Sequence, residues 1–232
     1  MQVVDLGYAL SEANPYWPGE GYRPFHFEII ATLEEDGVYS GAFSTPEHLG
    51  THMDAPNHFQ AGQVSIDKIG LEDLVAPAVV VDIREACQVD PDYRLSPDDL
   101  AAWENQHGLI PSGAVVFALT GWGQYWNDYD RYKNQDASGR LHFPGFSSEA
   151  ARFLVKERAI KGIGVDTLSV DYGLSTDFPV HHIVNGAGAY HIENAAKLEQ
   201  VPARGAWMIA APIRIENGSG GPARVWVVFK RD

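Results

Sequence analysis

The chain has 232 residues, of which 45% are hydrophobic and 21% are charged, and its formal net charge is -14. A chain of this length and composition can bury the core of a globular domain. Its acidity argues against nucleic acid and anionic membrane as partners, because both attract Lys and Arg. No basic-then-apolar leader and no run of about 18 apolar residues is found, so the default expectation is a cytoplasmic protein. The single cysteine, Cys87, excludes an intramolecular disulfide and is interpreted as an ordinary thiol.

Strands outnumber helices among the elements that the sequence predicts. Apolar runs and alternation predict strands over 2–6, 25–33, 76–83, 114–119, 163–167, 207–215 and 223–229. Helices are expected over 97–107, with Ser96 as N-cap and Pro97 at the first helical position, and over 148–158. Helices that fall between strands indicate an α/β or α+β fold. No linker or internal repeat divides residues 1–232, so a single domain is expected.

Turns and loops separate these elements. We expect a Pro- and Gly-rich loop over 11–21, a turn over 34–37, a loop with a short helix over 65–74, and a flexible Gly-rich turn over 216–222. An aromatic, turn-rich segment at 120–132 follows a predicted strand, which is where α/β proteins often place functional residues. Asp166 and Thr167 end another strand, and we expect them to contact the residues that bind the ligand or metal and not the ligand itself. His142 is interpreted as a loop residue.

The densest group of chemically active residues is the stretch His48-Leu-Gly-Thr-His52-Met-Asp54-Ala-Pro-Asn-His58-Phe59. Imidazole nitrogen and carboxylate oxygen are ligand types that suit zinc, manganese or iron. Gly50, Thr51 and Pro56 are poor helix residues, so an extended chain is expected here. In an extended chain the even offsets place three of the polar side chains on one side, and Pro56 ends the strand before the last histidine. A His-rich surface loop is the alternative, but the stretch contains no Lys or Arg, which favours a metal site.

The same stretch, HLGTHMDAPNHF, resembles the signature of the cyclase family of metal-dependent hydrolases, to which bacterial kynurenine formamidase and isatin hydrolase belong. The resemblance extends over most of the chain and implies the swivelling β/β/α fold of that family. It implies that His48, His52 and Asp54 bind one divalent cation, zinc or manganese. In the family a metal-binding His precedes a metal-binding Glu by twelve residues, a spacing that His181 and Glu193 match and His182 does not.

A second cation would then be shared by Asp54, His181 and Glu193, and members of the family differ in binding one ion or two. His58 is assigned as general acid/base, since an unperturbed imidazole has a pKa of about 6.5; a further metal ligand is the alternative for this residue. Asn185 and His191 receive no role from the sequence. The resemblance also implies a homodimer or a higher homo-oligomer.

The expected reaction is hydrolysis of an amide-like carbonyl by metal-activated water. N-formylkynurenine, an intermediate of tryptophan catabolism, is the first candidate substrate, and a cyclic amide or lactone such as isatin is the alternative. Trp17, Trp122, Tyr125 and Trp126 are candidates for stacking on a flat substrate, although each could instead cover the core. A binding protein that holds a small molecule without turning it over is a hypothesis of another class. A purely structural zinc site is disfavoured, because such sites usually contain cysteine.

Overall fold

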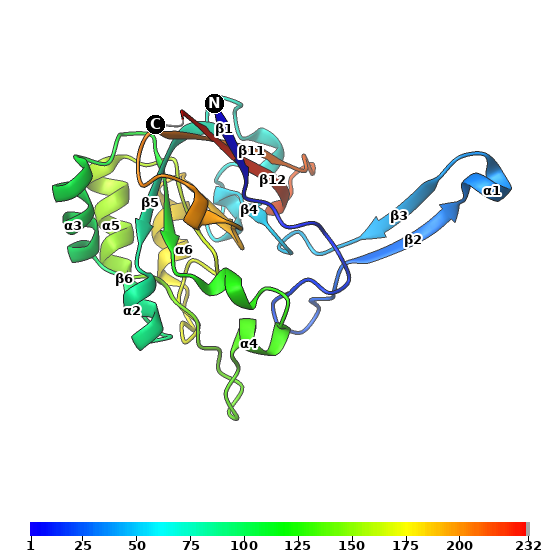
Figure 1. Ribbon diagram of the computed structural model, residues 1–232, viewed down its shortest axis with the longest axis horizontal. Coiled ribbons are helices and arrows are strands. Elements are labelled where there is room, and N and C mark those ends of the chain that lie inside the picture. The colour runs from blue at the N-terminus through cyan, green and yellow to red at the C-terminus, as the bar shows by residue number, and fades with distance from the viewer. Residues whose placement is uncertain (231–232) are drawn as a thin grey trace.

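A closed, barrel-like sheet organises the structure, a computed structural model that describes residues 1–230 (Figure 1). Its strands run in the order β1 (Gln2–Asp5), β12 (Gly220–Phe229), β11 (Ala206–Pro212), β5 (Val75–Asp82), β7 (Val115–Leu119), β9 (Gly162–Val165), β10 (Tyr190–Glu193) and β4 (His52–Asp54). The short strand β4 also pairs with β12, so the sheet closes on itself and β1 lies outside the ring along β12. The expected α/β class is confirmed.

Strands β5, β7 and β9 are parallel and form the apolar centre of the sheet. Their side chains alternate between two buried clusters: Val80 and Phe117 belong to one, and Val81 and Val116 to the other. The second cluster also contains Leu154 and other side chains of the helices α3 (Pro97–His107), α5 (Ser148–Arg158) and α6 (Pro179–Gly186). A strand that is buried on both faces reads as a continuous apolar run, which is why these strands were recognisable in the sequence.

The two predicted helices are confirmed at their expected bounds, as α3 and α5. The Ser96 side chain accepts a hydrogen bond from the Asp99 amide, and the Asp99 carboxylate accepts one from the Ser96 amide, which completes a capping box. Predicted strands are confirmed with small shifts at their ends. The expected turn at 34–37 is instead the short helix α1 (Leu33–Asp36), which Thr32 caps and Gly37 ends in the left-handed region.

The prediction of a flexible Gly-rich turn over 216–222 is wrong for its second half. Gly220, Gly221 and Pro222 begin strand β12 and pair with β4, where they lie opposite Asp54, Met53 and His52. A Cβ atom on Gly220 would lie 2.5 Å from Cε1 of His48. Glycine is therefore required here by close approach of two chain segments, a cause that turn composition cannot show.

The remaining elements are short. They are the helices α2 (Arg84–Val89) and α4 (Tyr129–Lys133), the strands β6 (Arg94–Leu95) and β8 (Gly145–Phe146), and the 3-10 turns η1 (Pro56–His58), η2 (Ile66–Lys68), η3 (Trp122–Tyr125) and η4 (Leu198–Gln200). Among residues 1–230, none of the helices is long and apolar enough to span a bilayer.

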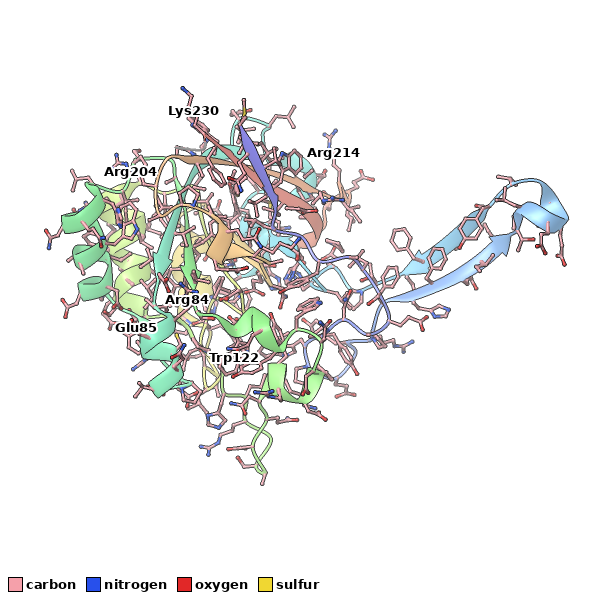
Figure 2. The ribbon with its side chains drawn as sticks, viewed as in Figure 1. Arg84, Glu85, Trp122, Arg204, Arg214 and Lys230 are labelled. Atoms are coloured by element: carbon pink, nitrogen blue, oxygen red, sulfur yellow. The ribbon has the colours of Figure 1, made fainter. Side chains whose placement is uncertain are left out.

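Strands β2 (His26–Ala31) and β3 (Ser40–Ser44) form a hairpin arm that projects from the body with α1 at its tip (Figure 1). Side chains along the arm stand clear of the body (Figure 2). Its large apolar side chains are 41% to 69% exposed, and they are Phe27, Ile29, Ile30, Leu33, Val38, Tyr39 and Phe43. The expected strand over 25–33 is thus confirmed as β2, but it packs on no core of its own chain.

Close approach of β8 to the segment 170–172 is a further constraint that a variant can test. A Cβ atom on Gly145 would lie 2.5 to 2.7 Å from backbone atoms of Val170, Asp171 and Tyr172, which cannot move independently. We expect Gly145→Ala to lower the free energy of unfolding by about 1–3 kcal/mol, measured by urea denaturation. Gly186→Ala is the matched control, since its Cβ would meet only Gln60 at 3.7 Å. Equal stability of the two variants would contradict the argument.

Candidate metal centre

The antiparallel pair β4 and β10 presents four polar side chains on one face. His52 lies opposite Glu193, and Asp54 lies opposite His191. Alternate residues of a strand point the same way, so the two cross-strand pairs form a square. All four side chains are at most 5% exposed, although none is apolar. Burying two carboxylates requires compensating positive charge, which imidazolium groups or a cation can provide.

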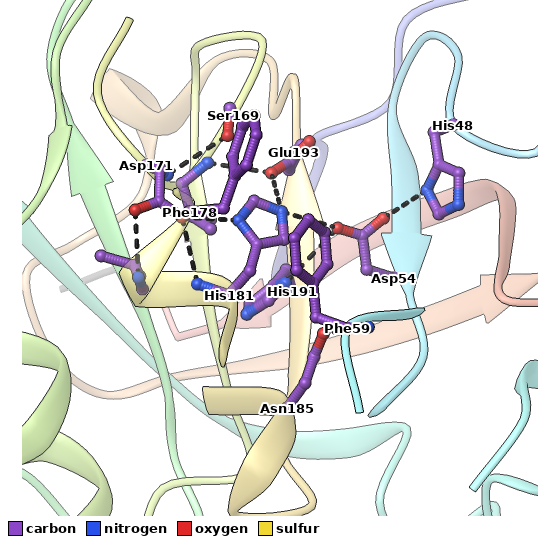
Figure 3. Close-up of polar contacts among 12 residues, drawn as sticks. His48, Asp54, Phe59, Ser169, Asp171, Phe178, His181, Asn185, His191 and Glu193 are labelled. Atoms are coloured by element: carbon purple, nitrogen blue, oxygen red, sulfur yellow. Dashed lines mark hydrogen bonds and ion pairs between the residues drawn. The ribbon is translucent and has the colours of Figure 1, made fainter. Parts of the chain in front are cut away.

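His181 joins this square from helix α6 (Figure 3). The carboxylate of Asp171 accepts hydrogen bonds from the backbone amides of Val180 and His181 and so holds the first turn of the helix. Its Oδ2 atom also accepts one from Nδ1 of His181 at 2.7 Å. This leaves Nε2 of His181 facing the square, 3.5 Å from Asp54 Oδ2 and 3.4 Å from Glu193 Oε1.

His48 reaches the square from the turn before β4. Its Nδ1 atom lies 2.7 Å from Asp54 Oδ1, and its Nε2 atom lies 3.0 Å from Ser219 Oγ. The Ser219 hydroxyl donates its proton to Glu47, so it can only accept from His48 Nε2. The lone pair of His48 Nδ1 therefore faces the carboxylate of Asp54.

His52 shows the same arrangement most clearly. Its Nδ1 atom donates to the carbonyl oxygen of Gly50 at 2.9 Å, and Nε2 points between Asp54 Oδ1 at 3.2 Å and Glu193 Oε2 at 3.4 Å. Within the described part of the chain, this buried Nε2 atom has no hydrogen-bond partner. Lone pairs that face carboxylate oxygens repel them unless a proton or a cation lies between. Three histidines fixed by outer partners, with their inner nitrogens toward two carboxylates, fit a divalent cation.

Three overlapping groups of potential ligand atoms lie within residues 1–230, and Asp54 belongs to each. They are His48, Asp54 and His58; Asp54, His181 and His191; and His52, Asp54 and Glu193. The structure thus brings together all five metal ligands that the sequence analysis named. It adds His191, whose Nδ1 atom lies 3.4 Å from Asp54 Oδ2.

The electrostatics of the bare site favour protons where a cation would bind. Burial alone would lower the pKa of His52, but the Asp54 and Glu193 carboxylates outweigh it and raise that pKa to about 10. Burial alone would raise the pKa of Asp54, but His48 and His52 hold it well below its usual range. A cation must displace these protons, so metal affinity is expected to rise with pH.

His58 differs from the other histidines. It lies in η1 and stacks on His48, with ring centroids 3.9 Å apart. Burial lowers the pKa of His58 to about 4, and the attraction of Asp54 offsets only part of that effect. Its imidazole is therefore neutral near pH 7, beside the carboxylates and at the edge of the cavity. This arrangement fits an acid/base group. The alternative, that His58 is a further metal ligand, stays open because His58 belongs to one of the three groups of potential ligand atoms.

A cavity of about 210 Å³ opens above the ligand set. Its aromatic walls come from the Pro- and Gly-rich loop and the residue just after it, from the residue that follows η1 and from the residue before α6. They are Tyr16, Trp17, Tyr22, Phe59 and Phe178. Trp17 therefore lies where a substrate contact was predicted. Trp122, Tyr125 and Trp126 do not line this cavity. They pack with Tyr132 in an apolar cluster behind it, against which Trp17 also packs, and Figure 2 shows Trp122 at η3. Their role as substrate contacts stays a prediction that this geometry does not support.

Two residues beside the site were not assigned from the sequence. His191 carried a usable signal, because it precedes Glu193 by two positions in a strand and must share its face. Asp171 carried none, because its contact with His181 depends on how the segment after β9 folds over α6. Asp166 was expected near the ligands, but it accepts hydrogen bonds from Thr120 and from the Gly121 amide instead.

Comparisons with known proteins agree with this geometry. The family described as "Putative cyclase" matches residues 4–172. Isatin hydrolase from Roseibium aggregatum is 34% identical over 77% of this chain and 70% of its own length. Kynurenine formamidase from Salinibacter ruber is 27% identical over 97% of this chain and 96% of its own. The structure of isatin hydrolase A from Labrenzia aggregata, bound to benzyl benzoate, superposes with a TM-score of 0.94 at 36% identity, covering 99% of this chain and 94% of that one. The chain belongs to the cyclase family, as the HLGTHMDAPNHF stretch predicted.

Proposed function

We propose that the protein is a metal-dependent hydrolase that cleaves an amide bond in a small aromatic or cyclic substrate. The observation that carries this proposal is the set of inner imidazole nitrogens, each fixed by an outer partner. All three face the Asp54 carboxylate, and those of His52 and His181 also face Glu193. A structural site would be closed by its ligands, whereas this one opens into a cavity with aromatic walls.

His48, His52, Asp54, His181 and Glu193 would hold one or two ions of zinc or manganese. A divalent cation bound there supplies Lewis-acid polarisation of a carbonyl group and lowers the pKa of a water molecule. Asp54 can serve two positions, because its Oδ1 atom faces His48 and His52 while Oδ2 faces His181.

His58 would accept a proton from the attacking water and deliver it to the departing nitrogen. Its neutral imidazole can accept a proton, and its stacking on His48 holds it beside the ligands. Among residues 1–230, no carboxylate is hydrogen-bonded to its side chain. Trp17, Phe59 and Phe178 would orient a flat substrate against the cation, since Trp17 and Phe59 both pack edge-on or tilted against Phe178.

Two substrates are candidates for this cavity. The sequence analysis placed N-formylkynurenine first, which would assign the protein to tryptophan catabolism. The higher sequence identity to isatin hydrolase than to kynurenine formamidase, 34% against 27%, and the TM-score of 0.94 to an isatin hydrolase structure favour a cyclic amide such as isatin. Isatin is therefore the second candidate substrate, and these comparisons are the observation that supports it. A cytoplasmic location remains part of the proposal.

The hairpin arm is proposed to pair with the arm of a second copy. Phe27 lies opposite Phe43, and Ile29 opposite Gly41, so one face of the arm is apolar. A two-stranded hairpin with an exposed apolar face is only marginally stable in water. A second arm related by a two-fold axis would cover that face with an identical one, which gives a closed homodimer.

Hydrolysis assays separate the candidates. We expect protein loaded with zinc or manganese to hydrolyse isatin or N-formylkynurenine, and a chelator to abolish the activity. Turnover of isatin alone would support the cyclic-amide reading, and turnover of the formyl compound alone would support a formamidase. Saturable binding of either compound without product would overturn the hydrolase and support a binding protein.

His58→Ala tests the acid/base assignment. We expect wild-type metal content with turnover reduced about 100-fold to 10,000-fold, because a positioned acid/base group contributes on that order. His182→Ala is the control, since His182 is exposed on α6 one residue after a ligand. Loss of metal from His58→Ala would instead make His58 a ligand, and full activity would exclude it from the reaction.

Sedimentation tests the role of the arm. We expect the wild-type protein to sediment as a dimer, and a variant with Phe27→Asp and Phe43→Asp to sediment as a monomer with its body folded. Glu28→Lys is the control on the opposite face of the arm, and it should remain dimeric. A monomeric wild-type protein would refute the proposed pairing.

A further inference from the structure

Asn194, which follows the ligand Glu193, holds the turn before β4 by two bonds. Its side-chain Nδ2 atom donates to the carbonyl oxygen of Gly50 at 2.9 Å. Its main-chain carbonyl accepts a hydrogen bond from the Thr51 hydroxyl at 2.7 Å. The Asn194 side chain is 2% exposed, so these bonds are shielded from water. Its φ of 56° is in the left-handed region, which Asn tolerates better than most residues.

The carbonyl oxygen of Gly50 is shared between Asn194 and His52. It accepts from His52 Nδ1 at 2.9 Å as well as from the Asn194 amide. Gly50 itself has a φ of 64°, so its backbone has few local restraints and depends on its hydrogen bonds for orientation. Whatever fixes this carbonyl therefore fixes the ring of His52 and the direction of its inner Nε2 atom.

Tyr132 fixes the other end of the Asn194 side chain. Its hydroxyl group lies 2.9 Å from Asn194 Oδ1 and 2.9 Å from the carbonyl oxygen of Asp166. The Gly50 carbonyl can only accept, so the amide nitrogen of Asn194 must face it, and the amide oxygen must face the Tyr132 hydroxyl. Tyr132 is fully buried on α4, within an apolar cluster to which the aromatic segment 120–132 also contributes Trp122 and Trp126.

We propose that Tyr132 and Asn194 are positioning residues that orient His52 for metal binding through the Gly50 carbonyl. The inference rests on the proposed metal-dependent function and assigns a role to the aromatic segment, which does not reach the cavity. The order of contacts is Tyr132 hydroxyl, Asn194 side chain, Gly50 carbonyl and His52 Nδ1, each step a hydrogen bond of 2.9 Å. Partners outside the ligand set typically change metal affinity about 10-fold to 100-fold when removed.

Metal affinity without substrate is the measurement that tests this role. Zn²⁺ affinity of metal-free protein is measured by competition with a chelating indicator, and the absorption spectrum of the Co²⁺-loaded protein reports ligand geometry. Tyr132→Phe removes only the hydroxyl group and keeps the ring. We expect about 10-fold to 100-fold weaker Zn²⁺ binding and an altered Co²⁺ spectrum, as for Asp171→Asn, which replaces the charged outer partner of His181 with a neutral amide.

Tyr125→Phe is the matched control. It lies in the same segment, partly buried, and its hydroxyl has no hydrogen-bond partner among the residues that the structure describes. Its Zn²⁺ affinity and Co²⁺ spectrum should equal those of the wild type. Equal losses in Tyr125→Phe and Tyr132→Phe would show a general packing effect and overturn the proposal.

A double-variant cycle tests whether Tyr132 acts through Asn194. Asn194→Gly permits the left-handed backbone, keeps the main-chain carbonyl that Thr51 uses, and removes only the amide. If the contacts form one chain, Tyr132→Phe should weaken Zn²⁺ binding no further in the Asn194→Gly background. Additive losses would refute the connection.

The outcomes separate this inference from the proposed function. Wild-type Zn²⁺ affinity in Tyr132→Phe would overturn the positioning role alone. Zn²⁺ binding by the wild type without hydrolysis of either candidate substrate would overturn the proposed activity, and the positioning role would still be decided by the affinities. A wild-type protein that binds no divalent metal would refute both.

Discussion

Two buried carboxylates on adjacent strands are the constraint on which the rest of the structure depends. Asp54 and Glu193 are nearly excluded from water, and each faces imidazole groups instead of solvent. Such charges are tolerated in a protein interior only when they are paired. In the bare site protons on the histidines provide the pairing, which is why the pKa of His52 is raised. Folding and metal binding are therefore coupled through the same atoms.

The closed sheet makes this arrangement possible. Strand β4 is only three residues long, yet it pairs with β10 on one edge and with β12 on the other. Its backbone is thereby fixed on both sides, so the side chains of His52 and Asp54 extend from a rigid backbone. The outer partners then fix each imidazole ring: Ser219 for His48, the Gly50 carbonyl for His52, and Asp171 for His181. Ser219 is distant in the chain, and the nearby Gly50 carbonyl is itself held by the distant Asn194, so the arrangement of the site depends on the closed fold.

Features that depend on local sequence were predictable, and those that depend on closure were not. The helix that begins after Ser96 was predicted to the residue, because its capping groups are adjacent in the chain. The five proposed ligands were recognisable because His48, His52 and Asp54 lie in a long family motif and the remaining two match the family's His-to-Glu spacing of twelve residues. The strand at Gly220–Pro222 was missed, since its glycines serve the approach of His48 across the barrel. The contacts of Asp171 and Asn194 likewise join residues whose proximity no local pattern reveals.

The proposed metal ligands and the proposed substrate walls come from different kinds of structure in this fold. The ligands lie mainly on strands and a helix of the body, whereas Tyr16, Trp17 and Tyr22 lie on a loop between β1 and the arm. A loop can change in sequence and length without disturbing the ladder that holds Asp54 and Glu193. Substrate preference can therefore diverge while the metal centre is kept. Relatives named isatin hydrolase and kynurenine formamidase, both similar to this chain, are consistent with that division. On the proposed function, we therefore expect the aromatic walls above the site, more than the ligands, to decide which amide is hydrolysed.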